Sequence, residues 1–135
     1  MNSSNDRTEL KESVIHDIVK AVSRLGTCQR SKVGAVIVRD GRIISTGYNG
    51  SPPGKPHCLD VGCEMVNGHC MRTVHAESNC IAFAARHGIS VEGGVIYVYG
   101  WITGGDLGIC PTCNKLAESA GIIKTVIVPL PLEER

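Results

Sequence analysis

Two short motifs constrain this chain more than any other feature: H-A-E at residues 75–77 and C-P-T-C at residues 110–113. Together they supply one imidazole, two thiols and a carboxylate two positions from the imidazole. A catalytic zinc site takes three protein ligands and keeps a fourth position open for water. The sequence therefore predicts that His75, Cys110 and Cys113 bind zinc and that Glu77 moves protons for the zinc-activated water.

Each motif falls at the start of a predicted helix. Residues 76–86 are rich in alanine and are followed by Gly88, and residues 111–120 begin with Pro111 and are followed by Gly121. Two cysteines three positions apart share one side of a helix start, where the dipole favours the thiolate that zinc requires. The alternative is a buried histidine near a chance pair of cysteines. The coincidence of both motifs with helix starts favours the metal site.

Composition limits the classes of partner. The chain has 135 residues, which we interpret as one domain (residues 1–135), with a net charge of +1, 4% aromatic residues and seven cysteines. Near-neutral charge and few aromatic rings argue against a nucleic-acid partner. Residues 1–9 are polar and unlike a signal peptide, and no apolar run is long enough to span a bilayer. We therefore expect no membrane partner, a cytoplasmic location, and cysteines that serve metal sites rather than disulfides.

The N-terminal half predicts a helix and a hairpin. Residues 6–25 form an amphipathic pattern ended by Gly26, with an apolar stripe of Leu10, Val14, Ile18, Val22 and Leu25. Residues 33–39 and 42–48 read as strands joined by an Asp-Gly turn. Gly34 and Gly47 lie within these strands, where the close approach of another backbone or of a ligand is one reason for glycine.

The C-terminal half predicts a parallel strand pair. Residues 94–100 and 124–128 read as strands that flank the helix at 111–120, with residues 101–109 as a glycine-rich connection. A strand–helix–strand unit of this kind makes a right-handed crossover with parallel pairing. An antiparallel hairpin joined to a parallel pair predicts a mixed sheet covered by helices, in the α/β class.

Residues 55–74 show no periodicity but contain His57, Cys58, Cys63, His69 and Cys70. A loop of this length usually has a function or is held by a cross-link. A structural zinc with four ligands would be such a cross-link, and Cys28 could contribute a ligand from outside the loop. The alternative is a set of free or half-buried thiols with incidental histidines. Cys80, within a helix, is expected to be a small core residue.

The motifs resemble a known family. They are V-G-A-V at 33–36, G-Y-N-G at 47–50, H-A-E-x-N at 75–79, and C-x-x-C at 110–113 followed by G-I at 121–122. In this order they resemble the deoxycytidylate (dCMP) deaminases of the zinc-dependent, cytidine deaminase-like superfamily, and the H-x-E…C-x-x-C pair is a signature of zinc nucleobase deaminases. The resemblance implies a three-layer αβα fold with a mixed sheet and helices on both faces. It also implies the hydrolytic conversion of dCMP to dUMP with release of ammonia.

The resemblance also implies roles for residues at the site. His75, Cys110 and Cys113 would be zinc ligands and Glu77 the proton shuttle, with Asn49 and Ala76 binding the substrate nucleotide. A second, structural zinc would be bound by four of five residues: Cys28, Cys58, Cys63, His69 and Cys70.

For regulation, the resemblance implies a homo-oligomer, with a hexamer expected, activated by dCTP and inhibited by dTTP. The effector, with Mg²⁺ as a candidate companion of its triphosphate, is expected near Tyr48 and Gly50. Arg86 falls where subunit and effector contacts are expected. A solvated arginine at a helix end is an equally good interpretation of Arg86.

Three features depart from the family pattern. Ile109 stands where the family usually has proline, and residues 100–109 exceed the family's short strand-to-helix step. This segment could reshape the base pocket, and Trp101 could stack on a ligand or make a surface contact. The sequence also ends soon after the last predicted strand, where relatives commonly continue with a helix and a strand. Two alternatives therefore stand: a deaminase of dCTP, a modified dCMP or another aminated base, and a non-catalytic, zinc-stabilised nucleotide-binding protein.

Overall fold

A computed structural model describes residues 3–67, 69–70, 72, 74–102 and 110–130. Its helices are α1 (Ser3–Ser23), α2 (Cys58–Val61), α3 (Ala76–Arg86) and α4 (Pro111–Ser119). Its strands are β1 (Ser31–Arg39), β2 (Arg42–Tyr48), β3 (Met65–Val66), β4 (His69–Cys70), β5 (Val95–Ile102) and β6 (Lys124–Ile127). Within these residues no helix combines the length and the apolar character needed to cross a membrane.

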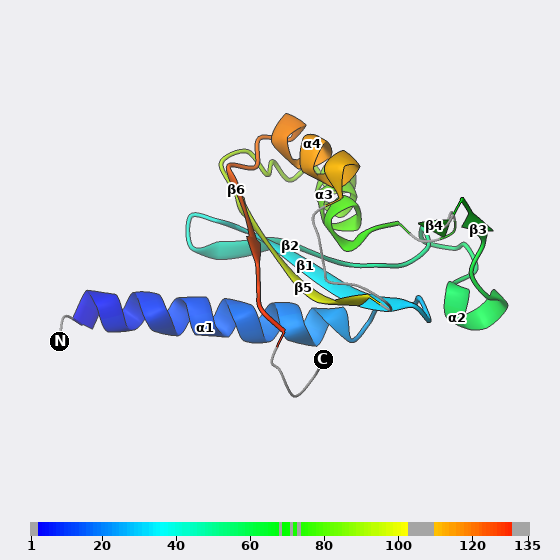
Figure 1. The fold of residues 1–135 in the computed structure, drawn as a ribbon. Coiled ribbons are helices and arrows are strands. Elements are labelled where there is room, and N and C mark those ends of the chain that lie inside the picture. The colour runs from blue at the N-terminus through cyan, green and yellow to red at the C-terminus, as the bar shows by residue number, and fades with distance from the viewer. Residues whose placement is uncertain (1–2, 68, 71, 73, 103–109, 131–135) are drawn as a thin grey trace.

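The main sheet has the strand order β2-β1-β5-β6. Strand β1 is antiparallel to both β2 and β5, whereas β5 and β6 are parallel and are connected through α4. Helix α1 covers one face, and α3 and α4 cover the other (Figure 1). The predicted mixed sheet, the parallel pair and the three-layer αβα class are confirmed.

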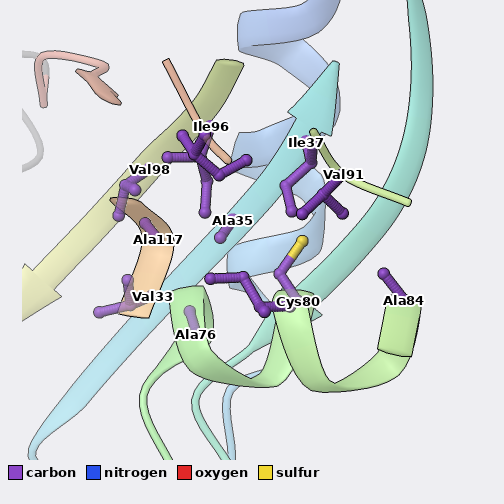
Figure 2. Packing of buried hydrophobic residues seen from close by; sticks show 12 residues of the cluster. Val33, Ala35, Ile37, Ala76, Cys80, Ala84, Val91, Ile96, Val98 and Ala117 are labelled. Carbon is purple, nitrogen blue, oxygen red and sulfur yellow. The ribbon is translucent and has the colours of Figure 1, made fainter. Parts of the chain in front are cut away.

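The core lies on both faces of β1, because this central strand is covered by helices on each side. Alternate side chains of a strand point to opposite faces. Ala35 and Ile37 therefore pack toward α3 and α4 with Ile96 (Figure 2), whereas Val36 packs toward Val19 of α1. Burial on both faces explains why this strand reads as a continuous apolar run instead of an alternating one.

Two glycines let the helices rest directly on the sheet. A Cβ atom on Gly34 would lie 2.6 Å from the backbone nitrogen of Ser23 in α1. A Cβ atom on Gly47 would lie 2.5 Å from the backbone nitrogen of Cys80 in α3. The close backbone approach predicted for both glycines is confirmed, and each supports a different helical layer.

Helix α1 differs from its prediction. It ends at Ser23 instead of residue 25, and the chain then turns through Arg24 and Leu25 with backbone hydrogen bonds three residues back. The residues that pack on the sheet are Ile15, Ile18, Val19 and Val22. Leu10, Val14 and Leu25 of the predicted stripe are exposed by 52%, 45% and 59%. The stripe is wrong at these three positions because the N-terminal part of α1 extends past the end of the sheet and Leu25 follows the helix (Figure 1).

Two further segments are more ordered than their patterns indicated. The stretch 55–74 contains α2 and a small hairpin in which Met65 pairs with Cys70. Elements of two to four residues are too short to create a hydrophobic period. Trp101 belongs to β5, where it pairs with Lys32, rather than to the connection, and the rest of that connection (103–109) lies outside the described residues.

Candidate metal centre

The starts of α3 and α4 meet at one site. His75 is the N-cap residue of α3, Cys110 is the N-cap residue of α4, and neither side chain caps its own helix. Cys113 follows in the first turn of α4 and is 3% exposed. The ligand atoms of His75, Cys110 and Cys113 all lie within 4.8 Å of one another, and His75 Nδ1 is 3.3 Å from Cys113 Sγ.

This donor set fits zinc. Bond lengths of about 2.0 Å to nitrogen and about 2.3 Å to sulfur place tetrahedral ligands about 3.5–3.8 Å apart. The observed separations allow such a geometry after small adjustments. Three ligands, one imidazole and two thiols, are typical of a catalytic zinc site with an open fourth position.

Glu77 lies in the first turn of α3, two residues after His75, and its side chain is buried at 8% exposure. The pKa of the Cys113 thiol is raised to about 11, mainly by burial and in part by the nearby Glu77 carboxylate, although the Ser78 hydroxyl, 3.3 Å from the sulfur, acts to lower it. The sequence predicted that the helix dipole would favour the thiolate, but burial outweighs that effect. Cys113 therefore needs a bound cation to lose its proton near neutral pH.

Two asparagines brace the loop that follows β2. Asn49 is 3% exposed, its Oδ1 accepts from the Val33 N–H at 2.8 Å, and its Nδ2 donates to the Ser31 carbonyl at 3.0 Å. Asn79 of α3 donates to the carbonyl of Tyr48 at 2.8 Å. The sequence offered two roles for Asn49, to cap or turn the chain or to present its amide to a ligand, and the structure shows it holding the chain; Asn79 was noted only as part of a motif.

The other residues predicted to contact substrate and effector fall into three places. Ala76, between His75 and Glu77, is 1% exposed and packs in the core. Tyr48 and Arg86 line a cavity of about 420 Å³ between β2 and α3, together with Phe83 and His87. Gly50 does not line this cavity, and its backbone pairs instead with Val74.

A second cluster joins three cysteines from distant parts of the chain. The sulfur atoms of Cys28, Cys58 and Cys63 lie within 4.8 Å of one another, with Cys28 and Cys63 3.9 Å apart. The side chains of His69 and Cys70 lie outside the described residues, although the backbone of β4 pairs with β3 beside this cluster. His57 precedes Cys58, and its Nδ1 atom is buried without a hydrogen-bond partner in the described part of the chain. The sequence noted His57 in the loop but did not include it in the ligand set.

Comparisons with known proteins agree with this geometry. A family model described as the cytidine and deoxycytidylate deaminase zinc-binding region matches residues 8–129. ComE operon protein 2 of Bacillus subtilis is 47% identical over 100 residues, which cover 74% of this chain and 49% of that protein. The deoxycytidylate deaminase of Enterobacteria phage T4 is 36% identical over 155 aligned positions, covering 87% of this chain and 77% of the phage protein.

The fold has a counterpart among solved structures. The dCMP deaminase of cyanophage S-TIM5, solved in complex with dCMP and dUMP, superposes with a TM-score of 0.70 at 29% identity and covers 88% of this chain and 80% of its own. This chain spans about half the length of the Bacillus relative and most of the two phage proteins. The family predicted from the four motifs is confirmed: the chain belongs to the cytidine and deoxycytidylate deaminase family and carries its zinc-binding region.

Proposed function

We propose that this protein catalyses the zinc-dependent hydrolytic deamination of dCMP to dUMP, with release of ammonia, and so serves the supply of pyrimidine deoxynucleotides. The observation that carries the proposal is the meeting of His75, Cys110 and Cys113 beside the buried carboxylate of Glu77. A purely structural zinc site is closed by four protein ligands and needs no neighbouring proton carrier. The names of the phage relatives and the nucleotides in the S-TIM5 complex support dCMP as the substrate.

In this proposal each group has one task. His75, Cys110 and Cys113 hold the zinc ion, which when bound lowers the pKa of the reacting water toward neutrality. Glu77 accepts a proton from that water, delivers it to N3 of the pyrimidine ring, and carries a second proton to the amine that leaves from C4. Its burial keeps bulk water from competing for these protons.

Asn49 and Ala76 are the proposed substrate contacts. The Asn49 carboxamide holds the start of β1, but a carboxamide oxygen has two lone pairs and only one accepts the Val33 N–H among the described residues. We propose that the second lone pair accepts a hydrogen bond from a hydroxyl of the nucleotide sugar. Ala76 stands between His75 and Glu77, and because its side chain packs in the core, its backbone is the part proposed to contact the base.

The protein also fits a second zinc ion and an effector. We assign the structural zinc to Cys28, Cys58 and Cys63, completed by His69 or Cys70, because the three described sulfur atoms already form a cluster. We assign dCTP and dTTP, with Mg²⁺ as a companion, to the cavity of Tyr48 and Arg86. That cavity offers aromatic rings to a base and a guanidinium to phosphate.

We further propose that the chain acts as one domain (residues 1–135) in a cytoplasmic homo-oligomer, a hexamer by resemblance. Apolar side chains exposed on α3, on α4 and in the turn after α4 support self-association. Among them Phe83 is 49% exposed, Leu116 41% and Ile123 73%. Multi-angle light scattering of the zinc-loaded protein measures the oligomeric state directly.

The decisive experiment is a deamination panel with dCMP, CMP, dCTP, deoxycytidine and 5-substituted dCMP, with ammonia release as the readout, with and without dCTP as effector. Turnover of dCMP above the others supports the proposal. Preferred turnover of dCTP or a modified dCMP would replace dCMP as the substrate and direct attention to Ile109 and the segment before it. Nucleotide-dependent thermal stabilisation without ammonia release would instead identify a binding protein.

The matched control for this panel is Glu77→Gln. Glutamine keeps the size of the side chain but cannot carry a proton, so we expect zinc content to stay unchanged and turnover to fall by at least about 10²–10⁴-fold. Zinc is measured by atomic absorption on the same preparation. Full activity in Glu77→Gln would contradict the role of Glu77 and leave the metal site itself intact.

A further inference from the structure

A groove on the opposite face of the sheet from the metal centre has the chemistry of a ligand site. Its volume is about 540 Å³, and its walls come from the C-terminal part of α1, the start of β1 and the end of β5. Figure 1 shows α1 on the face away from α3 and α4. The groove is therefore separate from the zinc ligands and from the cavity of Tyr48 and Arg86, which both lie on the other side of the sheet.

Three cations line this groove: Lys20, Arg24 and Lys32. Asp17 is the one carboxylate in its lining, and no ion pair within the described residues joins any of the three cations to an acidic side chain. The whole chain carries a net charge of only +1, so this local excess is not part of a generally basic protein. Such an excess of cations over carboxylates around a concave surface attracts an anion.

Two backbone carbonyls hold the side chain of Lys32 in place. Its ammonium group donates to the carbonyl of Gly26 at 3.0 Å and to the carbonyl of Arg24 at 3.4 Å, both in the turn that follows α1. An ammonium group has three donors, so one remains for a ligand. Lys32 is thus held at the groove by the protein rather than extended freely into solvent.

Aromatic rings lie beside these cations. Trp101 and Tyr99 are two residues apart on β5 and therefore share one face of the sheet. Tyr99 is 6% exposed and forms part of the base of the groove, where the Lys20 ammonium lies 5.6 Å from the centre of its ring. Trp101 is 39% exposed, so its ring is accessible to a stacking partner.

From these observations we propose that the groove binds a nucleoside phosphate, with the base stacked on Trp101 and the phosphates held by Lys20, Arg24 and Lys32. A flat ring linked to a phosphate is the small-molecule chemistry that matches an exposed indole beside three cations. Binding at this groove requires neither zinc nor turnover, so it can be tested independently of the proposed deaminase activity.

The chain supplies its own probe, because Trp101 is the only tryptophan in the sequence. Zinc-loaded protein is titrated with ATP, tripolyphosphate and adenosine while indole fluorescence is recorded, with N-acetyltryptophanamide as the correction for absorbed light. We expect saturable quenching by ATP. Tripolyphosphate should bind more weakly and reverse the quenching by competition, and adenosine should have little effect.

Two variants localise the signal. In the double variant Lys20→Gln/Arg24→Gln, two charged contacts are lost, so ATP binding should weaken by about tenfold or more. Arg86→Gln changes the other cavity and should leave the ATP titration unchanged. Deamination of dCMP in the absence of ATP should be the same in the double variant and the wild type, because neither residue belongs to the proposed catalytic machinery.

Several outcomes would overturn the proposal. Unsaturable quenching, or equal ATP affinity in the double variant and the wild type, would remove the groove as the site. Equal affinity for tripolyphosphate and ATP would exclude stacking of the base, and binding of single-stranded oligonucleotides without binding of ATP would indicate a nucleic-acid surface instead. If the double variant does not fold, failure of tripolyphosphate to reverse the quenching in the wild type is sufficient to reject the proposal.

Discussion

His75 and Cys110 occupy N-cap positions, where Ser, Thr, Asp or Asn usually accepts a hydrogen bond from the helix backbone. Neither side chain makes that bond here. A helix without a side-chain cap gives up about 1 kcal/mol of stability. In α3 and α4 these two positions instead direct an imidazole and a thiol toward a shared site. Each helix thus loses the stability of a side-chain cap, and its N-cap residue serves as a candidate metal ligand.

The first residue-level prediction separates the two buried cysteines of this region. Cys113 belongs to the metal cluster, whereas Cys80 is 0% exposed within the core and outside the cluster. We expect Cys113→Ser to lose the catalytic zinc and all measurable turnover. Cys80→Ala should keep both while lowering the free energy of unfolding, because it leaves a small cavity.

Zinc content by atomic absorption and ammonia release from the two variants check this expectation. Retention of a full zinc complement in Cys113→Ser would contradict the assignment of this ligand.

The second residue-level prediction concerns pH. Because burial raises the pKa of Cys113 to about 11, its thiol is protonated across the neutral range, and zinc must displace that proton to bind the thiolate. Zinc affinity should therefore rise as pH rises toward 11 and fall as the solution becomes more acidic. Each zinc taken up at the catalytic site near pH 7 should release protons, one of them from Cys113, because both cysteine ligands bind the metal as thiolates.

A pH indicator in weakly buffered solution measures this release during a zinc titration of the apo protein. Cys113→Ser is the control: because it is expected to lose the catalytic zinc, it should take up one zinc fewer and lack the proton release that accompanies this site. Zinc uptake without proton release would show that the thiolate already exists before the metal arrives.

At the element scale, the pair Gly34 and Gly47 offers a matched test of how each helical layer rests on the sheet. An added methyl group at Gly34 collides with the backbone of α1, and one at Gly47 collides with the backbone of α3. Overpacking of this kind costs about 1–3 kcal/mol, so Gly34→Ala and Gly47→Ala should both lower the free energy of unfolding by about that amount. Only Gly47→Ala should also lower turnover per folded protein, because α3 carries Glu77.

Gly41 is the control for these substitutions. It lies in the hairpin turn with a φ of +76° and has open space around its Cβ position, so Gly41→Ala should cost only about 1 kcal/mol of backbone strain and leave turnover intact. Urea unfolding and ammonia release measure both effects. Equal turnover in Gly34→Ala and Gly47→Ala would mean that the position of α3 is not set by its contact with β2.

The elements that the sequence predicted best are those with strong local signals at both ends. Helix α3 runs from Ala76 to Arg86 as expected, because alanines fill it and a glycine with positive φ follows it. The hairpin turn was equally clear from Asp40 and Gly41, which both have positive φ. The extent of the sheet beneath α1 is a tertiary property, so the exposure of Leu10 and Val14 could not be read from their helical period.

The ligands of the catalytic cluster could be predicted from the sequence more completely than those of the second cluster. Catalytic ligands at two helix starts carry a spacing signal, so His75 and the two cysteines of α4 could be named from the sequence. Cys28, Cys58 and Cys63 come together only through the short α2 and the loop before β1, which have no period. The local roles of Asn49 and Asn79 also depend on backbone groups that are distant in sequence, and no motif records such partners.

At the scale of the whole molecule, the three-layer αβα core and the peripheral segment 55–74 are stabilised in different ways. The sheet is covered on both faces by apolar side chains, whereas Leu59, Val61, Met65 and Val66 of the segment are exposed by 43–57%. A segment that buries so little apolar area gains little from the hydrophobic effect. The cysteine cluster that connects it to Cys28, just before β1, is therefore the main candidate for what keeps it in place.

The last prediction follows from this division. Purified protein should contain two zinc ions per chain, and Cys28→Ser should lower the content to one because it removes a ligand from the peripheral cluster alone. The remaining zinc should be catalytic, so dCMP turnover should persist, whereas limited proteolysis should cut within residues 59–66 faster than in the wild type. Cys80→Ser is the matched control and should retain two zinc ions and wild-type resistance in that segment. One zinc per wild-type chain, or unchanged proteolysis in Cys28→Ser, would mean that backbone pairing between β3 and β4 holds the segment without a metal ion.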